Sequence, residues 1–387
     1  MRSLDEFAAE KLSALDQAKL RRTPMVTARS GIWVERAGRR LLSFSCNDYL
    51  NLSQNPKVIA AAIEAMELHG IGAGASRLVT GNHPLYAALE DRLARLKGAE
   101  AACVFGSGYL ANAGIIPALV GPDDLIVMDE LSHACIHAGA KLSGAEVRLY
   151  RHADAGHAAK LLADHRSGKR HALIATDGVF SMDGDLAPLA ELSEMAARFD
   201  TWLLSDDAHG LGVLGGGRGS TFAFNHKGAS KIDVPLQMGT LSKAVGAYGG
   251  YLCASQTVID LMRTRARTFI YSTGLPPPVI AAAIAALDII EGDPAYAAGP
   301  LRKARLFTRA LNLPEAQSAI VPVIVGETES ALSASELLRD EGFLVVAIRP
   351  PTVPAGTARL RFAFTAQHPE SEIERLAEIV RQRVIRH

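Results

Sequence analysis

The chain has 387 residues, 48% of them hydrophobic, which is enough for two domains or for one large and one small domain. Basic and acidic residues number 41 each, so the net charge gives no attraction to nucleic acid or to an anionic membrane surface. No apolar run approaches the roughly 20 residues that span a bilayer, and acidic residues interrupt the apolar pattern near the N-terminus, unlike in a signal peptide. The cysteines, Cys46, Cys103, Cys135 and Cys253, are scattered, as is typical of reduced thiols, so we expect a cytoplasmic protein.

The N-terminal part predicts one amphipathic helix, two short strands and two further helices. Apolar residues recur at helical spacing over residues 3–20, and we expect this face to pack on another part of the chain or on a second subunit. Strand-like runs follow at 32–34 and 41–44. Helices are predicted over 56–68 and 84–97, each with a proline at its favoured first position.

From residue 101 onward, short apolar runs alternate with helical stretches. Alternation of this kind predicts βαβ units and a mostly parallel sheet. The predicted strands are 101–105, 125–128, 147–150, 172–175, 202–204, 237–238 and 251–253. After the prolines at 276–278, helices alternate with strands at 320–325, 344–348 and 359–364.

The predicted fold is therefore α/β, with a smaller α+β part at the C-terminal end. We expect residues 1–50 to form an N-terminal helix with short strands, residues 51–285 a large domain, and residues 286–387 a small domain. Open parallel sheets bind ligands beyond the carboxyl ends of their strands, so the residues after each strand are the candidates for a site.

Two strand ends carry glycine or histidine. Gly108 and Tyr109 follow the strand 101–105 at the start of a helix, where backbone N–H groups can bind a phosphate. His133 and His137 follow the strand 125–128, four residues apart, and could ligate a metal. No third ligand is apparent, so we expect no metal and interpret His133 as a ring that can stack on an aromatic group.

The next residues suggest acid and amine chemistry. Asp206 follows the strand 202–204; a buried carboxylate there needs a cationic partner, either within the protein or as a protonated pyridine nitrogen. His209 could then donate a hydrogen bond to a phenolate oxygen. Lys243 lies among small residues with no carboxylate within five positions, so burial should lower its pKa and favour the free amine that Schiff-base chemistry requires. The alternative for Lys243 is an ordinary lysine on a glycine-rich loop.

Together these residues match pyridoxal 5′-phosphate (PLP), with Thr240 as a further hydroxyl. The sequences Asp-Asp-Ala-His-Gly at 206–210 and Gly-Thr-Leu-Ser-Lys at 239–243 resemble the α-oxoamine synthases, which are fold-type I PLP-dependent enzymes. The resemblance extends from about residue 21 to residue 365. It implies a large domain with a mostly parallel seven-stranded sheet flanked by helices, a small C-terminal α+β domain, an N-terminal helical arm and a homodimer.

The resemblance also implies roles for residues in the site. Lys243 matches the Schiff-base lysine, Asp206 the acid on the pyridine nitrogen, His209 the partner of the ring oxygen, and His133 the residue stacked on the ring. Further cofactor contacts are implied at Gly108, Tyr109, Ser181 and Thr240, and substrate contacts at Arg21, Asn47, His133 and Thr352.

The resemblance leaves one choice open and implies one contribution from a partner. Arg359 or Arg361 should hold the carboxylate of an amino acid; both lie on the same face of a strand, so spacing does not choose between them, although position within the family favours Arg361. Ser272 and Thr273 resemble a segment that reaches the cofactor phosphate of the neighbouring subunit. The family usually has glycine where this chain has Asn51, and asparagine tolerates the left-handed backbone region better than most residues.

The segment 348–361 resembles the family member that condenses L-alanine with a pimeloyl thioester of coenzyme A or of acyl carrier protein, with loss of CO2, in biotin synthesis. The expected activity is therefore that of a PLP-dependent acyltransferase acting on small molecules. Alternatives are a glycine C-acetyltransferase or another α-oxoamine synthase and, more remotely, an aminotransferase. A regulator that senses PLP would usually carry a DNA-binding domain, for which this chain has no spare segment.

Overall fold

The structure is a computed structural model that describes residues 3–18, 20–223 and 231–385. Its largest element is a seven-stranded sheet in the order β4-β10-β9-β8-β7-β5-β6. The strands are β4 (Ala101–Phe105), β5 (Leu125–Asp129), β6 (Glu146–Tyr150), β7 (Ala172–Asp177), β8 (Trp202–Asp206), β9 (Leu236–Thr240) and β10 (Gly250–Ala254). All seven strands predicted for this part of the chain are confirmed.

The sheet is parallel except at β10, which pairs antiparallel with both β9 and β4. Only residues 241–249 connect β9 to β10, and a connection without a crossover helix cannot return the chain for a parallel pairing. The sheet is therefore mostly parallel, as predicted.

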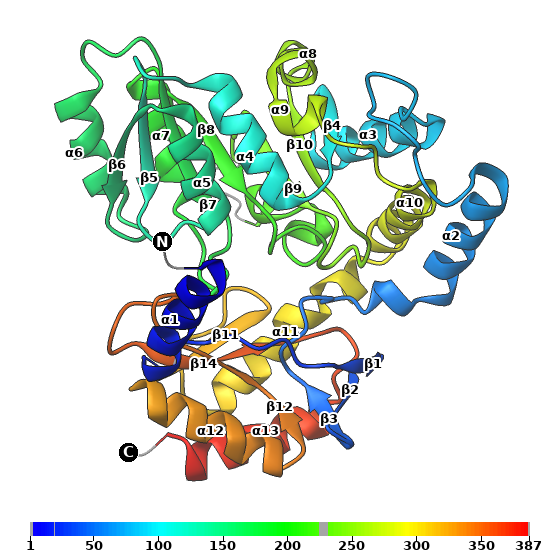
Figure 1. The fold of residues 1–387 in the computed structure, drawn as a ribbon, viewed down its shortest axis with the longest axis vertical. Helices are drawn as coiled ribbons and strands as arrows, with labels where there is room; N and C mark the ends of the chain where they lie inside the picture. The colour runs from blue at the N-terminus through cyan, green and yellow to red at the C-terminus, as the bar shows by residue number, and fades with distance from the viewer. Residues whose placement is uncertain (1–2, 19, 224–230, 386–387) are drawn as a thin grey trace.

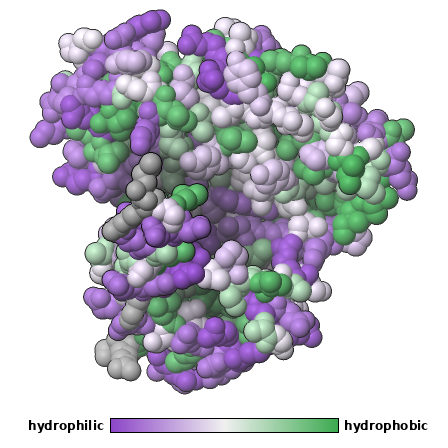
Figure 2. Space-filling model, viewed as in Figure 1, coloured by the Kyte–Doolittle hydropathy of each residue, from purple (hydrophilic) through white to green (hydrophobic). Residues whose placement is uncertain are grey.

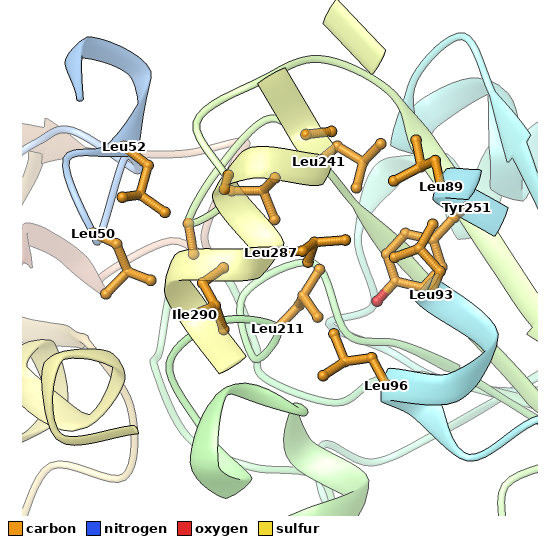
Figure 3. Close-up of a cluster of buried hydrophobic side chains, with 14 of the residues drawn as sticks. Leu50, Leu52, Leu89, Leu93, Leu96, Leu211, Leu241, Tyr251, Leu287 and Ile290 are labelled. Atoms are coloured by element: carbon orange, nitrogen blue, oxygen red, sulfur yellow. The ribbon is translucent and has the colours of Figure 1, made fainter. Parts of the chain in front are cut away.

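Helices cover both faces of this sheet (Figure 1). They are α3 (Pro84–Lys97), α4 (Gly108–Leu119), α5 (Ala134–Ser143), α6 (Ala155–His165), α7 (Leu189–Arg198), α8 (Gln256–Arg265), α9 (Arg267–Ile270) and α10 (Pro277–Gly292), while α2 (Pro56–His69) packs against α10. Successive side chains of a strand point to opposite faces, so neighbouring residues of β10 enter different cores. Tyr251 packs with Leu89, Leu93 and Leu287 from α3 and α10 (Figure 3), whereas Leu252 belongs to the core on the other face.

Two small sheets form the lower part of the molecule in Figure 1, with α11 (Pro294–Ala310), α12 (Thr328–Asp340) and α13 (Glu370–Arg383) beside them. One sheet has the order β1-β2-β3-β12 and the other β11-β14-β13. Their strands are β1 (Ala28–Ser30), β2 (Trp33–Arg36), β3 (Arg39–Ser43), β11 (Ile320–Gly326), β12 (Phe343–Leu344), β13 (Val346–Ile348) and β14 (Ala358–Ala363). The predicted strand 344–348 is thus two strands in different sheets, and the parallel pairing of β12 with β3 joins the two ends of the chain. The predicted domain boundaries stay a prediction.

The N-terminal helix α1 (Leu4–Gln17) confirms the predicted helical arm. It begins with a capping box in which Ser3 and Glu6 each accept the other's backbone N–H. None of its residues is buried, and Phe7 is 53% exposed, so its apolar face is not covered within the described residues. No helix in the described ranges is both long and apolar enough to cross a bilayer.

Candidate active site

The carboxyl ends of the central strands place several predicted site residues side by side. Asp177 ends β7 and pairs in register with Asp206 at the end of β8, while Thr240 ends the next strand, β9. Lys243 follows three residues later. Side chains from the small sheets join them, because Arg361 of β14 donates from Nε to the carbonyl oxygen of Ser181 at 2.6 Å. Figure 2 shows this face of the molecule hollowed between its two parts.

The Lys243 amine lies next to a histidine and no carboxylate pairs with it among the described residues. Its Nζ is 2.7 Å from Nε2 of His209. Burial lowers the pKa of Lys243 to about 8, against the opposing attraction of Asp206 and Asp177. This confirms the direction expected from its small, uncharged sequence neighbours. About one tenth of this amine is therefore uncharged at pH 7, far more than for an ordinary lysine.

Asp206 is a buried carboxylate whose partners are all neutral. Its Oδ2 accepts from Nδ2 of Asn112 at 2.8 Å and lies 3.8 Å from the thiol of Cys135, and its Oδ1 accepts from the backbone N–H of Ala208 at 3.0 Å. In the part of the chain that the structure describes, no lysine, arginine or histidine forms an ion pair with it. A carboxylate that is only 3% exposed normally has a cationic partner, so this environment fits a bound cation such as a protonated pyridine nitrogen.

The neighbouring Asp207, unlike Asp206, has a cationic partner within the protein. Its Oδ2 lies 2.6 Å from Nζ of Lys97, and both side chains are buried. The structural ion pair that the sequence left open as an alternative for Asp206 is thus found one residue later, at Asp207. The contrast between the two adjacent carboxylates supports a ligand-binding role for Asp206.

His133 caps the N-terminus of α5 and leaves its ring accessible. Its Nδ1 accepts the backbone N–H of Cys135 at 3.2 Å, and its own backbone N–H donates to Oδ2 of Asp177 at 2.7 Å. The side chain is exposed. His137 lies further along the same helix, and the described residues contain no group of three or more His, Cys, Asp or Glu that could hold a metal. The geometry therefore suits stacking on a flat group.

His209 is held between Lys243 and a tyrosine. Its Nδ1 lies 2.6 Å from the hydroxyl oxygen of Tyr49, which also lies 3.3 Å from Oδ1 of Asn47. Burial and the nearby Lys243 ammonium hold the pKa of His209 well below its usual range, so the imidazole is neutral. The loop that carries Tyr49 turns at Asn51, whose φ of 54° confirms that asparagine occupies the left-handed region there.

The two candidate arginines of β14 differ in their partners. Arg359 forms an ion pair with Asp183 and donates from Nε to the carbonyl oxygen of Thr357 at 3.0 Å. Besides its bond to a backbone carbonyl, Arg361 donates from Nη1 and Nη2 to Oδ1 of Asn47, both at 3.2 Å. No carboxylate in the described ranges pairs with this buried guanidinium. Its charge is thus available for an anionic ligand, whereas that of Arg359 is already neutralised.

The first turn of α4 is closely packed against the end of β9. A Cβ at Gly108 would lie 3.3 Å from Cε of Met238 and 3.4 Å from Cβ of Thr240, so a larger residue would crowd this turn. The hydroxyl of Thr240 donates to the carbonyl oxygen of Gly249 at 2.7 Å, and Tyr109 is exposed. Free N–H groups of a helix N-terminus make this place suitable for a phosphate.

Four predicted residues lie apart from this cluster. Arg21 is exposed and pairs with Asp16 at 2.7 Å, while Thr352 is exposed and accepts from Arg22 at 3.4 Å. Ser272 is half-buried, and Thr273 is exposed in a short bridge with Ser76. None of the contacts described for these residues reaches Lys243, so a role for them requires substrate or a second subunit.

Sequence reasoning missed four residues of the cluster: Tyr49, Asn112, Cys135 and Asp177. Asp177 could have been found, because it ends a strand just as Asp206 does. Asn112 and Cys135 lie within helices next to predicted residues, but nothing in the local pattern aims them at Asp206. Tyr49 meets His209 across 160 positions of sequence, which no local pattern indicates.

Comparison with known proteins gives a consistent result. The sequence model described as aminotransferase class I and II matches residues 39–380. The chain is 61% identical over 386 residues to a putative 8-amino-7-oxononanoate synthase of Acidiphilium cryptum, covering 100% of this chain and 99% of the relative. It is 66% identical over 346 residues to an 8-amino-7-oxononanoate synthase of Methylocella silvestris, covering 89% and 97%.

Solved structures agree with the fold. A serine palmitoyltransferase variant from S. paucimobilis with a bound PLP–myriocin aldimine superposes with a TM-score of 0.90 at 28% identity, over 98% of each chain. An 8-amino-7-oxononanoate synthase from Francisella tularensis gives a TM-score of 0.75 at 28% identity, over 89% of this chain and 98% of that one. These similarities confirm the predicted fold-type I architecture.

Proposed function

The chain belongs to the aminotransferase class I and II family and, within it, to the 8-amino-7-oxononanoate synthases, and from this premise we propose that it condenses L-alanine with a pimeloyl thioester, releasing CO2. The observation that carries the chemistry is Asp206, a buried carboxylate without a cationic protein partner, on a strand beside that leading to Lys243. PLP is the cofactor that this arrangement fits; when bound, it supplies the electron sink that stabilises a carbanion at the α-carbon of an amino acid.

The residues of the chain divide the work around the cofactor. Asp206 holds the protonated ring nitrogen, His133 covers the ring, and His209 donates to its phenolic oxygen. The first turn of α4 would hold the phosphate, with Gly108, Tyr109, Ser181 and Thr240 as contacts. Ser272 and Thr273 reach the phosphate of the partner subunit in a homodimer.

Lys243 provides both the covalent attachment and the base. Its pKa of about 8 leaves part of the amine uncharged near neutral pH, so Lys243 would hold the aldehyde group of PLP and would accept the proton from the α-carbon of alanine. A general base works best when its pKa lies near the working pH, which the burial of this amine provides.

Arg361 binds the carboxylate of alanine. Support comes from its Nη1 and Nη2 groups, which donate to the neutral Oδ1 of Asn47 and to no carboxylate among the described residues, and from the ion pair that already neutralises Arg359. Asn47 helps to align the guanidinium. Arg21 and Thr352 contact the acyl donor, and His133 polarises its thioester carbonyl as charge develops on the oxygen.

The acyl donor is pimeloyl-coenzyme A or pimeloyl-acyl carrier protein. The enzyme works as a homodimer, which the exposed apolar face of α1 supports. It works in the cytoplasm, which the four unpaired cysteines support.

The test is a product analysis with paired substrates. Purified protein is supplied with L-alanine and a pimeloyl thioester, and separately with glycine and acetyl-coenzyme A, and each product is weighed by mass spectrometry. The proposal predicts 8-amino-7-oxononanoate from the first pair. Turnover of the second pair alone would reassign the chain to glycine C-acetyltransferase chemistry. Pyruvate from alanine without any condensation product would indicate an aminotransferase.

A further inference from the structure

Tyr49 is a buried phenol in contact with the histidine that faces Lys243. Its side chain is fully buried, and its hydroxyl oxygen lies 2.6 Å from Nδ1 of His209. On the opposite side of the imidazole, Nε2 lies 2.7 Å from Nζ of Lys243. The hydroxyl, the ring and the amine therefore form a continuous hydrogen-bonded row.

The backbone around Tyr49 holds the phenol in a defined place. Its carbonyl oxygen accepts the N–H of Ala366 at 2.7 Å, and its own N–H donates to the carbonyl oxygen of Asn47 at 2.8 Å. The next turn is fixed by Asp48, whose Oδ1 accepts the N–H of Leu52 at 2.9 Å. Because the backbone on both sides of Tyr49 is held by hydrogen bonds, its hydroxyl keeps a fixed position relative to His209.

The distances decide where the single hydroxyl proton of Tyr49 points. Burial raises the pKa of Tyr49, so the phenol keeps this proton. It has two possible acceptors, Nδ1 of His209 at 2.6 Å and Oδ1 of Asn47 at 3.3 Å. Oδ1 of Asn47 already accepts two N–H groups of Arg361, and hydrogen bonds weaken with length, so the imidazole nitrogen is the favoured acceptor.

A neutral imidazole carries one proton on either of its nitrogens, and the partner of one nitrogen determines the state of the other. We infer that Tyr49 is a positioning residue: when the Lys243 amine carries no charge and can accept a hydrogen bond, Tyr49 donates to Nδ1 of His209, fixes the proton of that ring on Nε2 and so presents a hydrogen-bond donor beside Lys243. The alternative tautomer would offer a lone pair at this place. On the proposed function, the donor faces the phenolic oxygen of PLP, which a lone pair would repel.

The tautomer can be read without any assumption about the reaction. Nitrogen-15 NMR of protein labelled at histidine distinguishes a protonated Nε2 from a protonated Nδ1, and a His209→Asn variant assigns the signal. We expect the unsubstituted protein to carry the proton on Nε2 at about pH 9, where the Lys243 amine is largely uncharged and can accept a hydrogen bond. A proton on Nδ1 of His209 would overturn the inference even if the protein binds PLP and makes the proposed product, so the two claims fail separately.

The Tyr49→Phe variant tests the cause. Loss of an ordinary hydrogen bond should shift the tautomer ratio toward Nδ1–H by roughly fivefold, with a matching or larger loss of kcat/KM. Tyr251→Phe is the matched control, because Tyr251 is equally buried and its hydroxyl has no hydrogen-bond partner among the described residues (Figure 3). The control should change neither quantity.

Two outcomes count against the role of Tyr49. One is a His209 signal that keeps its tautomer ratio in Tyr49→Phe. The other is an equal shift in Tyr251→Phe, which would show that loss of any buried hydroxyl is sufficient. Should Tyr49→Phe fail to fold, Asn47→Ala replaces it: removing the competing acceptor must leave the proton of His209 on Nε2, and a move to Nδ1 refutes the inference.

Discussion

The two arginines of β14 give a sharp prediction because they differ in one respect, the presence of a counter-ion. We consider Arg361→Ala and Arg359→Ala separately. Arg361 is buried and donates to neutral oxygens only, whereas Arg359 is paired with Asp183. If the carboxylate of alanine binds Arg361, the first variant loses a charge-assisted, two-pronged contact and the second does not.

The expected magnitudes follow from these contacts. Truncating one partner of a buried, hydrogen-bonded charge pair costs about 2–5 kcal/mol of binding free energy. Arg361→Ala should therefore lower the affinity for alanine by roughly 30-fold or more. Arg359→Ala should leave alanine affinity within about threefold. It should instead lower the free energy of unfolding, by about 2–3 kcal/mol, because it strands the partly exposed carboxylate of Asp183.

Titration of the visible absorption of the cofactor with L-alanine gives the affinity, and urea unfolding gives the stability of each variant. An equal loss of alanine affinity in Arg359→Ala and Arg361→Ala would refute the assignment of the carboxylate to Arg361. This assignment is also refuted if both variants bind alanine as the unsubstituted protein does.

Three further predictions concern charges elsewhere in the fold. Asp206→Asn should lower kcat/KM by more than about 30-fold, because a neutral amide cannot pair with a pyridinium nitrogen; a loss under threefold contradicts that role. Lys97→Met should reduce the free energy of unfolding by about 3–5 kcal/mol by leaving Asp207 buried and unpaired, while the affinity for alanine stays within twofold of the unsubstituted protein. Although burial opposes its charge, hydrogen bonds to two carboxylates, that of Asp129 first, raise the pKa of His152 to about 10. His152 therefore adds stability that is complete below about pH 6.5 and is lost as the pH rises towards 10. In urea unfolding, His152→Gln should lower the free energy of unfolding most at pH 6 and least above pH 10. An equal loss at both pH values would contradict this prediction.

The sheet was predictable because its strands are buried on both faces and read as continuous apolar runs between helices. The strand 101–105, for example, is buried at every position and coincides with β4. The run 344–348 was less informative, because its first residue, Leu344, pairs with β3, whereas Val346–Ile348 pair with β14. A local pattern indicates that a strand forms but does not identify its partner.

The site was predictable where one rule sufficed and not where distant residues decide. The rule of ligand binding beyond strand ends selected Asp206, and the small, uncharged neighbours of Lys243 selected that lysine, both from the sequence alone. Spacing did not decide between Arg359 and Arg361, because a period of two places both on one face, and only position within the family favoured Arg361. The choice depends on Asp183, which lies 176 positions from Arg359 in the chain.

The most direct test of the central claim is the site at which PLP attaches. The purified protein is reduced with borohydride in the presence of PLP, digested, and searched by mass spectrometry for a modified peptide. The account predicts one stably modified residue, Lys243, and no such label in Lys243→Ala, which should still bind the cofactor without a covalent bond. A label on another lysine, or a protein that stays colourless when PLP is offered, would contradict it.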